Sequence, residues 1–383
     1  MRVTHLSLKD FRNYAEAELP LHAGPNLLIG RNGQGKTNLV EAIGYFASLR
    51  SHRVTGDAAL VRAGADAAVA RMRLQAGERD VLLEVQINRD RANRAQVNRN
   101  SVRPREVTRW FSSVAFAPED LIIVRGEPSG RRRFLDEALV ARHPMAASVL
   151  ADYEKVVRQR TSLLKSSRGS LRVIESTLPI WDAQLIELGS QIMLARRELL
   201  RDLIPPLQLG YEALAGADHA PGLSMHESMS DALRPERVSR ETLSEEFREA
   251  LDLVRVKEID RGVTLIGPHR DDMACTLNQL PVKGYASHGE SWSYALSLKL
   301  ALAELLRTES TAGDPVIILD DVFAELDASR RTRLMAAVGE YEQVIVTAAV
   351  ESDVPQDLQW FRTHIESGEI LSVESHGDTD QHA

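Results

Sequence analysis

Apolar and polar positions change their period along the chain, and the first change marks a strand, a glycine loop and a helix. Residues 3–8 alternate between apolar and polar, and the polar run 11–14 follows, which predicts a strand and a turn. The short apolar run 27–29 stops at Gly30. Apolar residues between positions 39 and 46 then recur at helical spacing.

Two further periods follow in the middle of the chain. Short alternating segments over 68–102 predict antiparallel strands. Residues 149–163 and 181–199 step by three and four, which predicts two helices with heptad-like seams that pair with each other. We expect a turn at 166–170, a helix start at Thr177 and Pro179, a stop at Pro205 and Pro206, a further helix over 243–254, and strand-like segments near Val263.

The C-terminal third alternates between helix and strand. Residues 291–306 have the spacing of a helix, while 316–319 and 344–346 are continuous apolar runs. Parallel strands buried on both faces have this appearance. The pattern predicts an α/β fold with a mixed sheet and an inserted helical lobe.

Composition favours a folded protein of two lobes. The chain has 383 residues, of which 43% are hydrophobic and 27% charged, and chains of this length usually form more than one core. No apolar run approaches the ~18 residues of a membrane span, and charged residues interrupt the first twenty positions. The single Cys275 excludes an internal disulfide and a cysteine-rich metal site. These features predict a cytoplasmic protein.

The charge is unevenly distributed. The formal net charge is −8, yet residues 89–109 hold seven arginines against Asp90 and Glu106, and residues 155–172 hold six basic residues and no acid. Residues 371–383 form an acidic tail that we expect to be solvated.

The glycine loop carries a phosphate-binding motif of the form GxxxxGK[ST] between the predicted strand and helix. Backbone N–H groups of such a loop and the helix N-terminus attract phosphate, a lysine contacts the β and γ oxygens, and a hydroxyl ligates Mg²⁺. Here Lys36 and Thr37 take these two roles. The motif consists of Gly30, Arg31, Asn32, Gly33, Gln34, Gly35, Lys36 and Thr37.

A complementary acidic motif ends the buried strand at 316–319. Asp320 and Asp321 follow it directly, at the carboxyl end where ligands bind in open α/β sheets. Asp320 is a candidate Mg²⁺ ligand, and Asp321 is a candidate to orient or deprotonate an attacking water. No Asn-Lys-x-Asp guanine-reading motif occurs in the chain.

Ser287, His288, Gly289 and Glu290 precede the helix predicted from 291. Small residues at a helix start allow the backbone to approach a phosphate, although ordinary helix capping uses the same residues.

The order of these motifs resembles an ABC-type ATPase head of the SMC-like kind, and the chain resembles the RecF family of bacterial recombination mediators over nearly its whole length. The resemblance depends on residues 11–14, the phosphate loop, residues 118–136, residues 267–272 and residues 321–334.

The resemblance implies ATP and Mg²⁺ as cofactors and an ATP-dependent homodimer joined head to head around two nucleotides. It implies binding to DNA at single-strand gaps or junctions, with RecO and RecR as partners in placing RecA on single-stranded DNA, in replication-linked repair and the SOS response. Because Asp321 is one methylene shorter than the glutamate common in fast ABC ATPases, we expect slow, DNA-stimulated ATP hydrolysis.

Site roles follow from the same resemblance. ATP would contact residues 30–37 together with Asn38 and Arg12, residues 287–290 would reach the γ-phosphate of the opposite protomer, and Asp327 would cross the same interface. Thr347 stands at the switch position, where a transporter ATPase has histidine. Glu119 lies near the Q-loop position, which lacks a glutamine, so its role toward Mg²⁺ is open.

The motifs divide the chain into four parts: 1–140 and 257–370 as the two parts of the ATPase head, 141–256 as the helical lobe, and 371–383 as the tail. Two other readings stay open: a soluble phosphotransferase for a small molecule, and a transporter ATPase subunit that requires a membrane partner.

Two basic motifs allow more than one reading. Residues 131–133, three consecutive arginines, would bind either neighbouring acids such as Asp136 or DNA phosphates. His269 and Arg270 would either hold the two lobes together or face the nucleotide.

Overall fold

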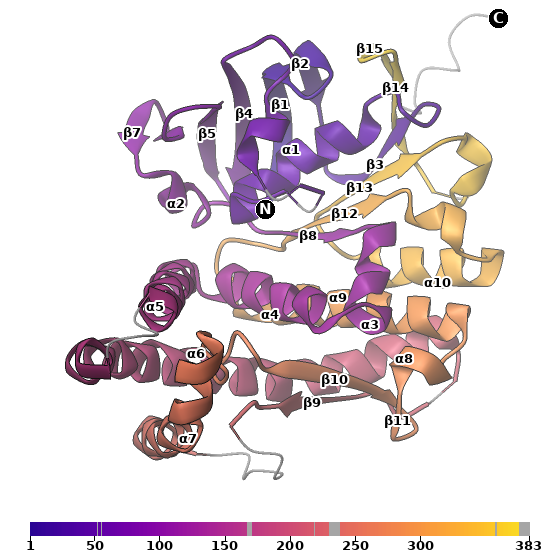
Figure 1. Ribbon diagram of the computed structural model, residues 1–383. Coiled ribbons are helices and arrows are strands. Elements are labelled where there is room, and N and C mark those ends of the chain that lie inside the picture. The colour runs from indigo at the N-terminus through magenta and orange to yellow at the C-terminus, as the bar shows by residue number, and fades with distance from the viewer. Residues whose placement is uncertain are drawn as a thin grey trace, which may run out of the picture. The chain divides into compact units, whose positions relative to one another are not determined.

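The computed structural model describes residues 1–51, 53–54, 56–166, 171–217, 219–229, 238–356 and 358–374, with the backbone alone at 171–175 and 372–374. The chain forms two compact units (Figure 1). The first consists of Met1–Leu121, Leu209–Asp218 and His288–Ala383, and the second of Ile122–Gln208 and His219–Ser287. The predicted lobe 141–256 lies largely in the second unit; the division at 140, 256 and 370 stays a prediction.

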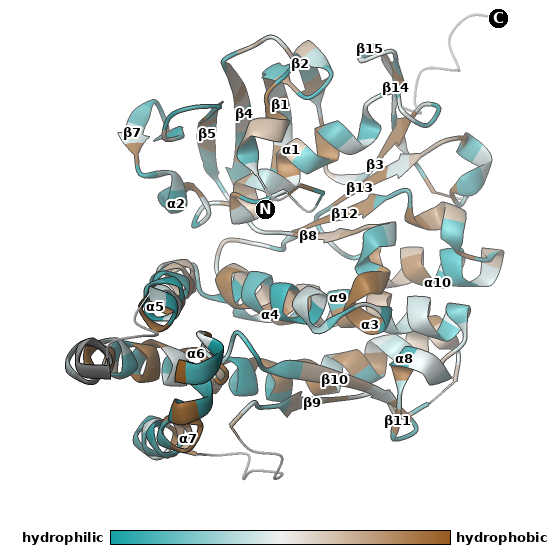
Figure 2. Cartoon of the chain, in the orientation of Figure 1, coloured by the Kyte–Doolittle hydropathy of each residue, from teal (hydrophilic) through white to brown (hydrophobic). Residues whose placement is uncertain are grey.

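A mixed six-stranded sheet forms the centre of the first unit. Its order is β15-β14-β3-β13-β12-β8, with β15 antiparallel and the other neighbours parallel. Every residue of β12 and β13 is buried, and both strands are strongly hydrophobic in Figure 2, which confirms the strands predicted at 316–319 and 344–346. The strands are β3 (Gly24–Ile29), β8 (Ser113–Phe116), β12 (Val316–Asp320), β13 (Gln343–Ala348), β14 (Phe361–Glu366) and β15 (Glu369–Glu374). Because β15 includes 371–374, the expected tail overlaps this strand.

A second sheet of the first unit is antiparallel, in the order β2-β1-β4-β5-β6-β7. Alternate residues of β4 and β5 are buried, so one face packs on the core and the other is polar. This confirms the strands predicted over 3–8 and 68–102. The strands are β1 (Arg2–Phe11), β2 (Tyr14–Pro20), β4 (Ala67–Ala76), β5 (Arg79–Asn88), β6 (Arg94–Val97) and β7 (Asn100–Val102).

The helices of the first unit carry the motifs. Helix α9 begins at His288, three residues before the predicted start at 291, so most of the run 287–290 lies inside its first turn. The helices are α1 (Lys36–Ser48), η1 (Asp57–Leu60), α2 (Pro104–Val107), η2 (Pro118–Asp120), α9 (His288–Glu309), η3 (Val322–Glu325), α10 (Ala328–Val338) and η4 (Glu351–Asp353).

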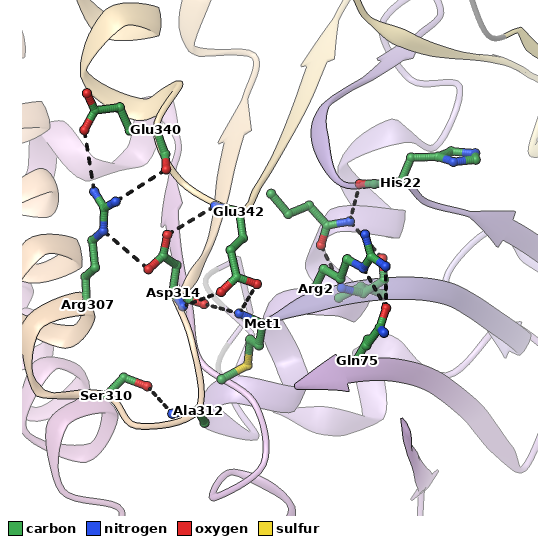
Figure 3. A network of polar contacts seen from close by, with 12 residues as sticks. Met1, Arg2, His22, Gln75, Arg307, Ser310, Ala312, Asp314, Glu340 and Glu342 are labelled. Carbon is green, nitrogen blue, oxygen red and sulfur yellow. Dashed lines mark hydrogen bonds and ion pairs between the residues drawn. The ribbon is translucent and has the colours of Figure 1, made fainter. Parts of the chain in front are cut away.

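Hydrogen bonds of Gln343 and an ion pair of Met1 join the two sheets where β1 meets β13. The fully buried Gln343 donates from Nε2 to the carbonyl oxygens of Val3 and His22, at 2.8 Å each, and accepts from the Val3 N–H at 2.8 Å. The Met1 ammonium forms an ion pair with Glu342 at 2.6 Å (Figure 3). A buried amide that satisfies three backbone groups fixes the register of the two sheets.

The second unit combines helices with a small sheet of order β11-β10-β9. None of the helices that the structure describes is long and apolar enough to cross a membrane. The elements are α3 (Leu121–Arg125), α4 (Pro128–Arg142), α5 (Ala146–Ser166), α6 (Leu171–Ala215, whose end lies in the first unit), β9 (Gly222–His226), α7 (Arg240–Arg261), β10 (Asp272–Leu277), β11 (Leu280–Pro281) and α8 (Val282–Tyr285).

Helix α6 corrects two predicted boundaries. Pro179, Pro205 and Pro206 lie inside the helix, which begins at Leu171, before the predicted start, and continues past the predicted stop. A proline in a helix costs about 3 kcal/mol, but Leu203 and Leu207 on either side of the pair are fully buried, and this packing outweighs the local preference.

Two other predictions about this region had different outcomes. Residues 263–271 form no strand, and the next one, β10, starts at 272. The helix predicted at 243–254 is confirmed as the longer α7. Of the turn predicted at 166–170, Ser166 ends α5 and the rest lies outside the described residues.

The predicted pairing of the two long helices is confirmed, because residues of α5, α6 and α7 share one apolar cluster. Arg160, on the α5 seam, is fully buried and pairs with Asp182 at 2.8 Å and Glu258 at 2.5 Å. A buried cation held by two carboxylates is satisfied within the unit.

The arginine run 131–133 is bonded inside the second unit. Arg131 forms two hydrogen bonds with Asp272, at 2.7 and 2.8 Å, Arg132 donates to the Asp271 carbonyl, and Arg133 pairs with Glu137. The His269 ring bonds the Tyr153 hydroxyl at 2.8 Å, and burial lowers the pKa of His269 to about 4. These contacts favour the structural interpretation of the arginine run. The His269 contact lies within the second unit, so it supports neither a link between the units nor contact with the nucleotide.

Replacing Gln343 with Met should lower stability, because it takes this partner away from the buried N–H and carbonyl of Val3 and from the partly buried carbonyl of His22. Unpartnered buried groups cost roughly 1–3 kcal/mol each, so we expect a loss of about 2–4 kcal/mol after relaxation. Tyr14→Phe is the control, since the buried Tyr14 hydroxyl has no hydrogen-bond partner among the described residues, and its removal should change stability by less than about 0.5 kcal/mol. Denaturant unfolding measures both, and equal effects would contradict the assignment.

Candidate nucleotide-binding site

The phosphate loop connects β3 to α1, as predicted from the sequence. Gly35 caps the helix N-terminus at φ 113°, and Gly33 has φ 82°, conformations that residues with a side chain rarely adopt. The buried Lys36 ammonium donates to the carbonyl oxygen of Gly30 at 2.7 Å, across the loop. The loop is therefore wrapped around its own lysine.

Two glycines of the loop allow close contact with neighbouring segments. A Cβ at Gly30 would lie 2.2 Å from the carbonyl oxygen of Ile365 on β14, and one at Gly35 would lie 2.6 Å from the Tyr14 hydroxyl. The loop thus lies between β14 and the β1–β2 turn, and larger residues at either glycine would displace it.

Asp320 joins three elements at the end of β12. Its Oδ1 accepts from the Thr347 hydroxyl on β13 at 2.7 Å and from the Thr37 hydroxyl on α1 at 3.1 Å. The carboxylate is 4% exposed. The three motif residues, which come from distant parts of the sequence, therefore meet at one buried carboxylate.

The pKa of Asp320 is raised to about 6, chiefly by burial and also by the charges of Asp321 and Glu119, while the hydrogen bonds from Thr347 and Thr37 oppose the rise. Glu119 itself is exposed on η2. The site therefore concentrates negative charge that favours a bound cation.

Asp321 follows in a left-handed conformation, with φ 52°. Its N–H donates to the Thr347 hydroxyl at 2.9 Å, and its Oδ1 lies 3.9 Å from the Lys36 ammonium. A non-glycine residue at positive φ is strained, and such strain is typical of functional positions. The backbone bond to Thr347 holds this conformation.

A pocket of about 170 Å³ opens beside these residues. Polar and apolar residues share its walls, which come from the phosphate loop, from the segment after β12 and from the end of β13. The pocket is lined by Asn32, Pro118, Asp321, Phe323, Ala324, Glu325, Thr347, Ala348, Ala349 and Asp353.

The side chain of Arg12 is held by protein groups. Its guanidinium donates twice to the buried Glu41, at 2.6 and 2.9 Å, and once to the Ala59 carbonyl at 3.0 Å. Asn38 donates to Asn13 at 2.7 Å and accepts from Arg53 at 2.8 Å. Direct contact of Arg12 or Asn38 with ATP stays a prediction.

Sequence reasoning did not find the groups that hold Gln34. The β14–β15 turn donates from the Ser367 N–H to the Gln34 side chain, and from the Gly368 N–H to the Gln34 carbonyl oxygen at 3.1 Å. Asn13 donates to the same carbonyl at 3.4 Å. The dipeptide Ser367-Gly368 between two strand-like runs was a signal for a hairpin turn, but not for its contact with the loop.

Residues 287–290 are the predicted signature run, and Asp327 lies in the predicted D-loop. Gly289 of this run lies beside Arg330, the ion-pair partner of Asp327. Asp327 caps α10 by accepting from the Arg330 N–H at 2.9 Å and pairs with the Arg330 guanidinium at 2.8 Å. A Cβ at Gly289 would lie 2.8 Å from that guanidinium. The His288 ring accepts from the Trp292 indole at 3.1 Å and is 60% exposed. Together these residues form one accessible surface at the start of α9 and α10.

Among the residues that the structure describes, no group of three or more His, Cys, Asp or Glu side chains could hold a metal ion. A transition-metal site of that kind is therefore not found in this part of the chain, whereas Mg²⁺ commonly uses one or two protein oxygens, phosphates and water.

The family model "RecF/RecN/SMC N terminal domain" matches residues 2–368. The chain belongs to the RecF family. The DNA replication and repair protein RecF of Leifsonia xyli is 54% identical over 97% of this chain and 99% of its own length. The RecF protein of Streptomyces avermitilis is 49% identical over 97% and 100%.

Solved structures agree with this membership. The recombination mediator protein RecF with ATPrS, of the RecFOR pathway, has a TM-score of 0.87 at 27% identity, and the match covers 96% of this chain and 97% of that one. An Smc head domain of Pyrococcus furiosus, with a TM-score of 0.54 at 14% identity, shares the fold. The predicted ABC-type ATPase head is thereby confirmed.

Asp320→Asn should stabilise the nucleotide-free RecF-family protein at neutral pH. Because the folded-state pKa is raised to about 6 from an ordinary value of about 3.9, burying the ionised form is increasingly unfavourable as pH rises from about 4 to 6. We expect the variant to gain about 1–3 kcal/mol at pH 7.5 and about half as much at pH 5. Thermal unfolding at both pH values measures the difference, and an equal gain at both would refute this origin.

Proposed function

We propose that this chain binds ATP in the phosphate loop and uses it to assemble a dimer on DNA during recombinational repair. The observation that carries the proposal is that the Thr37 and Thr347 hydroxyls meet at the Asp320 carboxylate, with the Lys36 ammonium 3.9 Å from the adjacent Asp321. Lys36 supplies a positive charge to the β- and γ-phosphates when it leaves its contact with Gly30, and the loop N–H groups and the α1 N-terminus contact the remaining oxygens.

Mg²⁺ fits the residues present. The Thr37 hydroxyl and the Asp320 carboxylate are 3.1 Å apart, and both are the hard oxygen donors that this ion prefers. Bound there, Mg²⁺ would neutralise charge on the phosphates. Glu119, the third candidate ligand, lies outside this pair and contributes through its charge.

We assign to Asp321 the role of orienting or deprotonating the attacking water. Its carboxylate lines the pocket, and Thr347 fixes its backbone. An aspartate at this position reaches less far than a glutamate, so ATP hydrolysis should be slow. Slow hydrolysis would keep the ATP-bound state in place for longer.

A second protomer would complete the site. The signature residues, above all Gly289, share a surface with Asp327 and Arg330, and Asp327 is 54% exposed. Such a surface is available to the γ-phosphate of a nucleotide held by another copy, which supports the proposed trans roles of 287–290 and of Asp327. ATP would then stabilise the closed dimer by binding both protomers, and hydrolysis would release it.

The biological role rests on the relatives. They are named as DNA replication and repair proteins, and one solved relative is a mediator in the RecFOR pathway with a bound nucleotide. We propose that this chain likewise recognises gaps or single-strand/duplex junctions, and acts with RecO and RecR to load RecA in repair and the SOS response.

Lys36→Ala should abolish ATP-dependent dimerisation, because the phosphates lose their principal cation. Asp321→Asn should retain ATP and hold the dimer, because only the water-directing group is lost. Light scattering with and without ATP and gapped duplex measures both, with wild type as the reference. Unchanged dimerisation of the Lys36 variant would remove the phosphate loop from assembly, and an Asp321 variant that binds ATP but stays monomeric would contradict the dimer.

A further inference from the structure

The free edge of the antiparallel sheet is strongly basic. Strand β7 is the last strand of this sheet, and α2 follows it (Figure 1). Residues 89–109, which form this edge, contain seven arginines and two acids, in a chain whose formal net charge is −8. The charge of this segment therefore opposes that of the whole molecule.

Some of these arginines have structural roles. The Arg89 guanidinium donates to the carbonyl oxygens of Val61, Arg62 and Ala65, at 2.8 to 2.9 Å. Arg91 donates to Asn88 at 3.0 Å. These two side chains hold the loop between β5 and β6.

Four others have no such role. Arg94, Arg99, Arg103 and Arg105 are exposed, and within the described part of the chain their guanidinium groups form no ion pair or hydrogen bond. They lie on β6, in the β6–β7 turn, and at the start of α2. Arginines that are grouped on one edge without ion-pair partners repel one another.

The backbone that carries these arginines is fixed. The turn residue Asn98 donates from its N–H to the Leu82 carbonyl and accepts from the Leu82 N–H, at 2.8 Å each, which anchors the turn to β5. Asn93, just before β6, donates to Asp57 at 2.7 Å, and Asp57 accepts from Tyr45 on α1 at 3.0 Å. The arginines are therefore presented by an ordered scaffold, which lowers the entropy lost when they bind a ligand.

An aromatic side chain lies just beyond the same helix. Trp110 is 41% exposed and is positioned by a backbone bond to Val107. An exposed indole next to unpaired arginines offers a flat apolar surface beside positive charge, which is the combination that contacts nucleic acid.

Two basic side chains in the described part of the other basic stretch are paired. In residues 155–172, Arg160 is fully buried in its carboxylate pair, and Arg158 pairs with Glu154 at 3.7 Å. Its charge is partly neutralised inside the second unit.

We propose that the β6–β7 hairpin and α2 form a contact surface for the phosphate backbone of DNA, with Arg94, Arg99, Arg103 and Arg105 as the phosphate contacts. This inference rests on the proposed DNA-binding function and locates it. Guanidinium groups bind phosphate in a forked geometry, and no base-reading element is present at this edge, so binding should depend on salt and little on sequence.

The test uses the full chain with Arg99→Glu and Arg103→Glu combined. Fluorescence anisotropy with a labelled gapped duplex, in the presence of ATP and over a range of salt concentrations, measures affinity. We expect at least tenfold weaker binding at moderate salt, and a logarithmic salt slope smaller in magnitude by about 2, because two phosphate contacts are lost.

The Arg99→Lys, Arg103→Lys variant should retain most of the binding, and Arg158→Glu is the matched control from the other basic stretch. ATP binding and ATP-dependent dimerisation should be unchanged in all three.

Three results would overturn the assignment. If the double Glu variant binds DNA as well as wild type does, the surface is elsewhere, while the proposed function stands. If wild type itself binds no DNA, the proposed function fails together with the surface. If the variant loses binding to phosphatidylglycerol vesicles but not to DNA, the edge recognises anionic lipid.

Discussion

The architecture of the site depends on one buried carboxylate that accepts two hydroxyl hydrogen bonds. Asp320 ends the central strand β12, and its Oδ1 receives the hydroxyls of Thr37 and Thr347 from the neighbouring helix and strand. A carboxylate this deeply buried is costly, as the rise of its pKa to about 6 indicates. In the proposed function, a bound cation would offset this cost by neutralising the carboxylate.

The phosphate loop is constrained from outside as well. Gly30 and Gly35 permit contact with β14 and the β1–β2 turn that any side chain would prevent, and Gln34 is bonded by Ser367 and Gly368. The β14–β15 hairpin therefore helps to hold the phosphate loop in place. Because Lys36 is bonded to its own loop, the proposed nucleotide binding would exchange an internal hydrogen bond for a phosphate contact, which would moderate affinity.

The sequence predicts most of what local pattern controls. The strand, glycine loop and helix around Lys36 follow from composition and periodicity, and the buried strand before Asp320 follows from an unbroken apolar run. Periodicity fails where tertiary packing decides: α6 continues through Pro205 and Pro206, since buried leucines on either side hold it.

The sequence predicted the motifs of the candidate site, but it did not predict the hydrogen bonds and ion pairs that hold the motif residues in place. Thr347 was expected at the switch position, yet its bonds to Asp320 and Asp321 could not be read from sequence. The hydrogen bonds between the Arg12 guanidinium and the Glu41 carboxylate could not be predicted from the sequence either. Such contacts join residues distant along the chain, and no periodic pattern records which polar groups meet.

The central claim is that one active site is built from two copies of the chain, and mixed variants test it most directly. Lys36→Ala removes the phosphate-loop half, and Ser287→Arg blocks the signature half. Each variant alone should be inactive, but an equimolar mixture should recover up to about half of wild-type ATP hydrolysis, because the dimers that can close are mixed ones and each contains one intact composite site of two. A mixture as inactive as its components, although mixed dimers form, would contradict the account, as would either variant hydrolysing ATP normally alone.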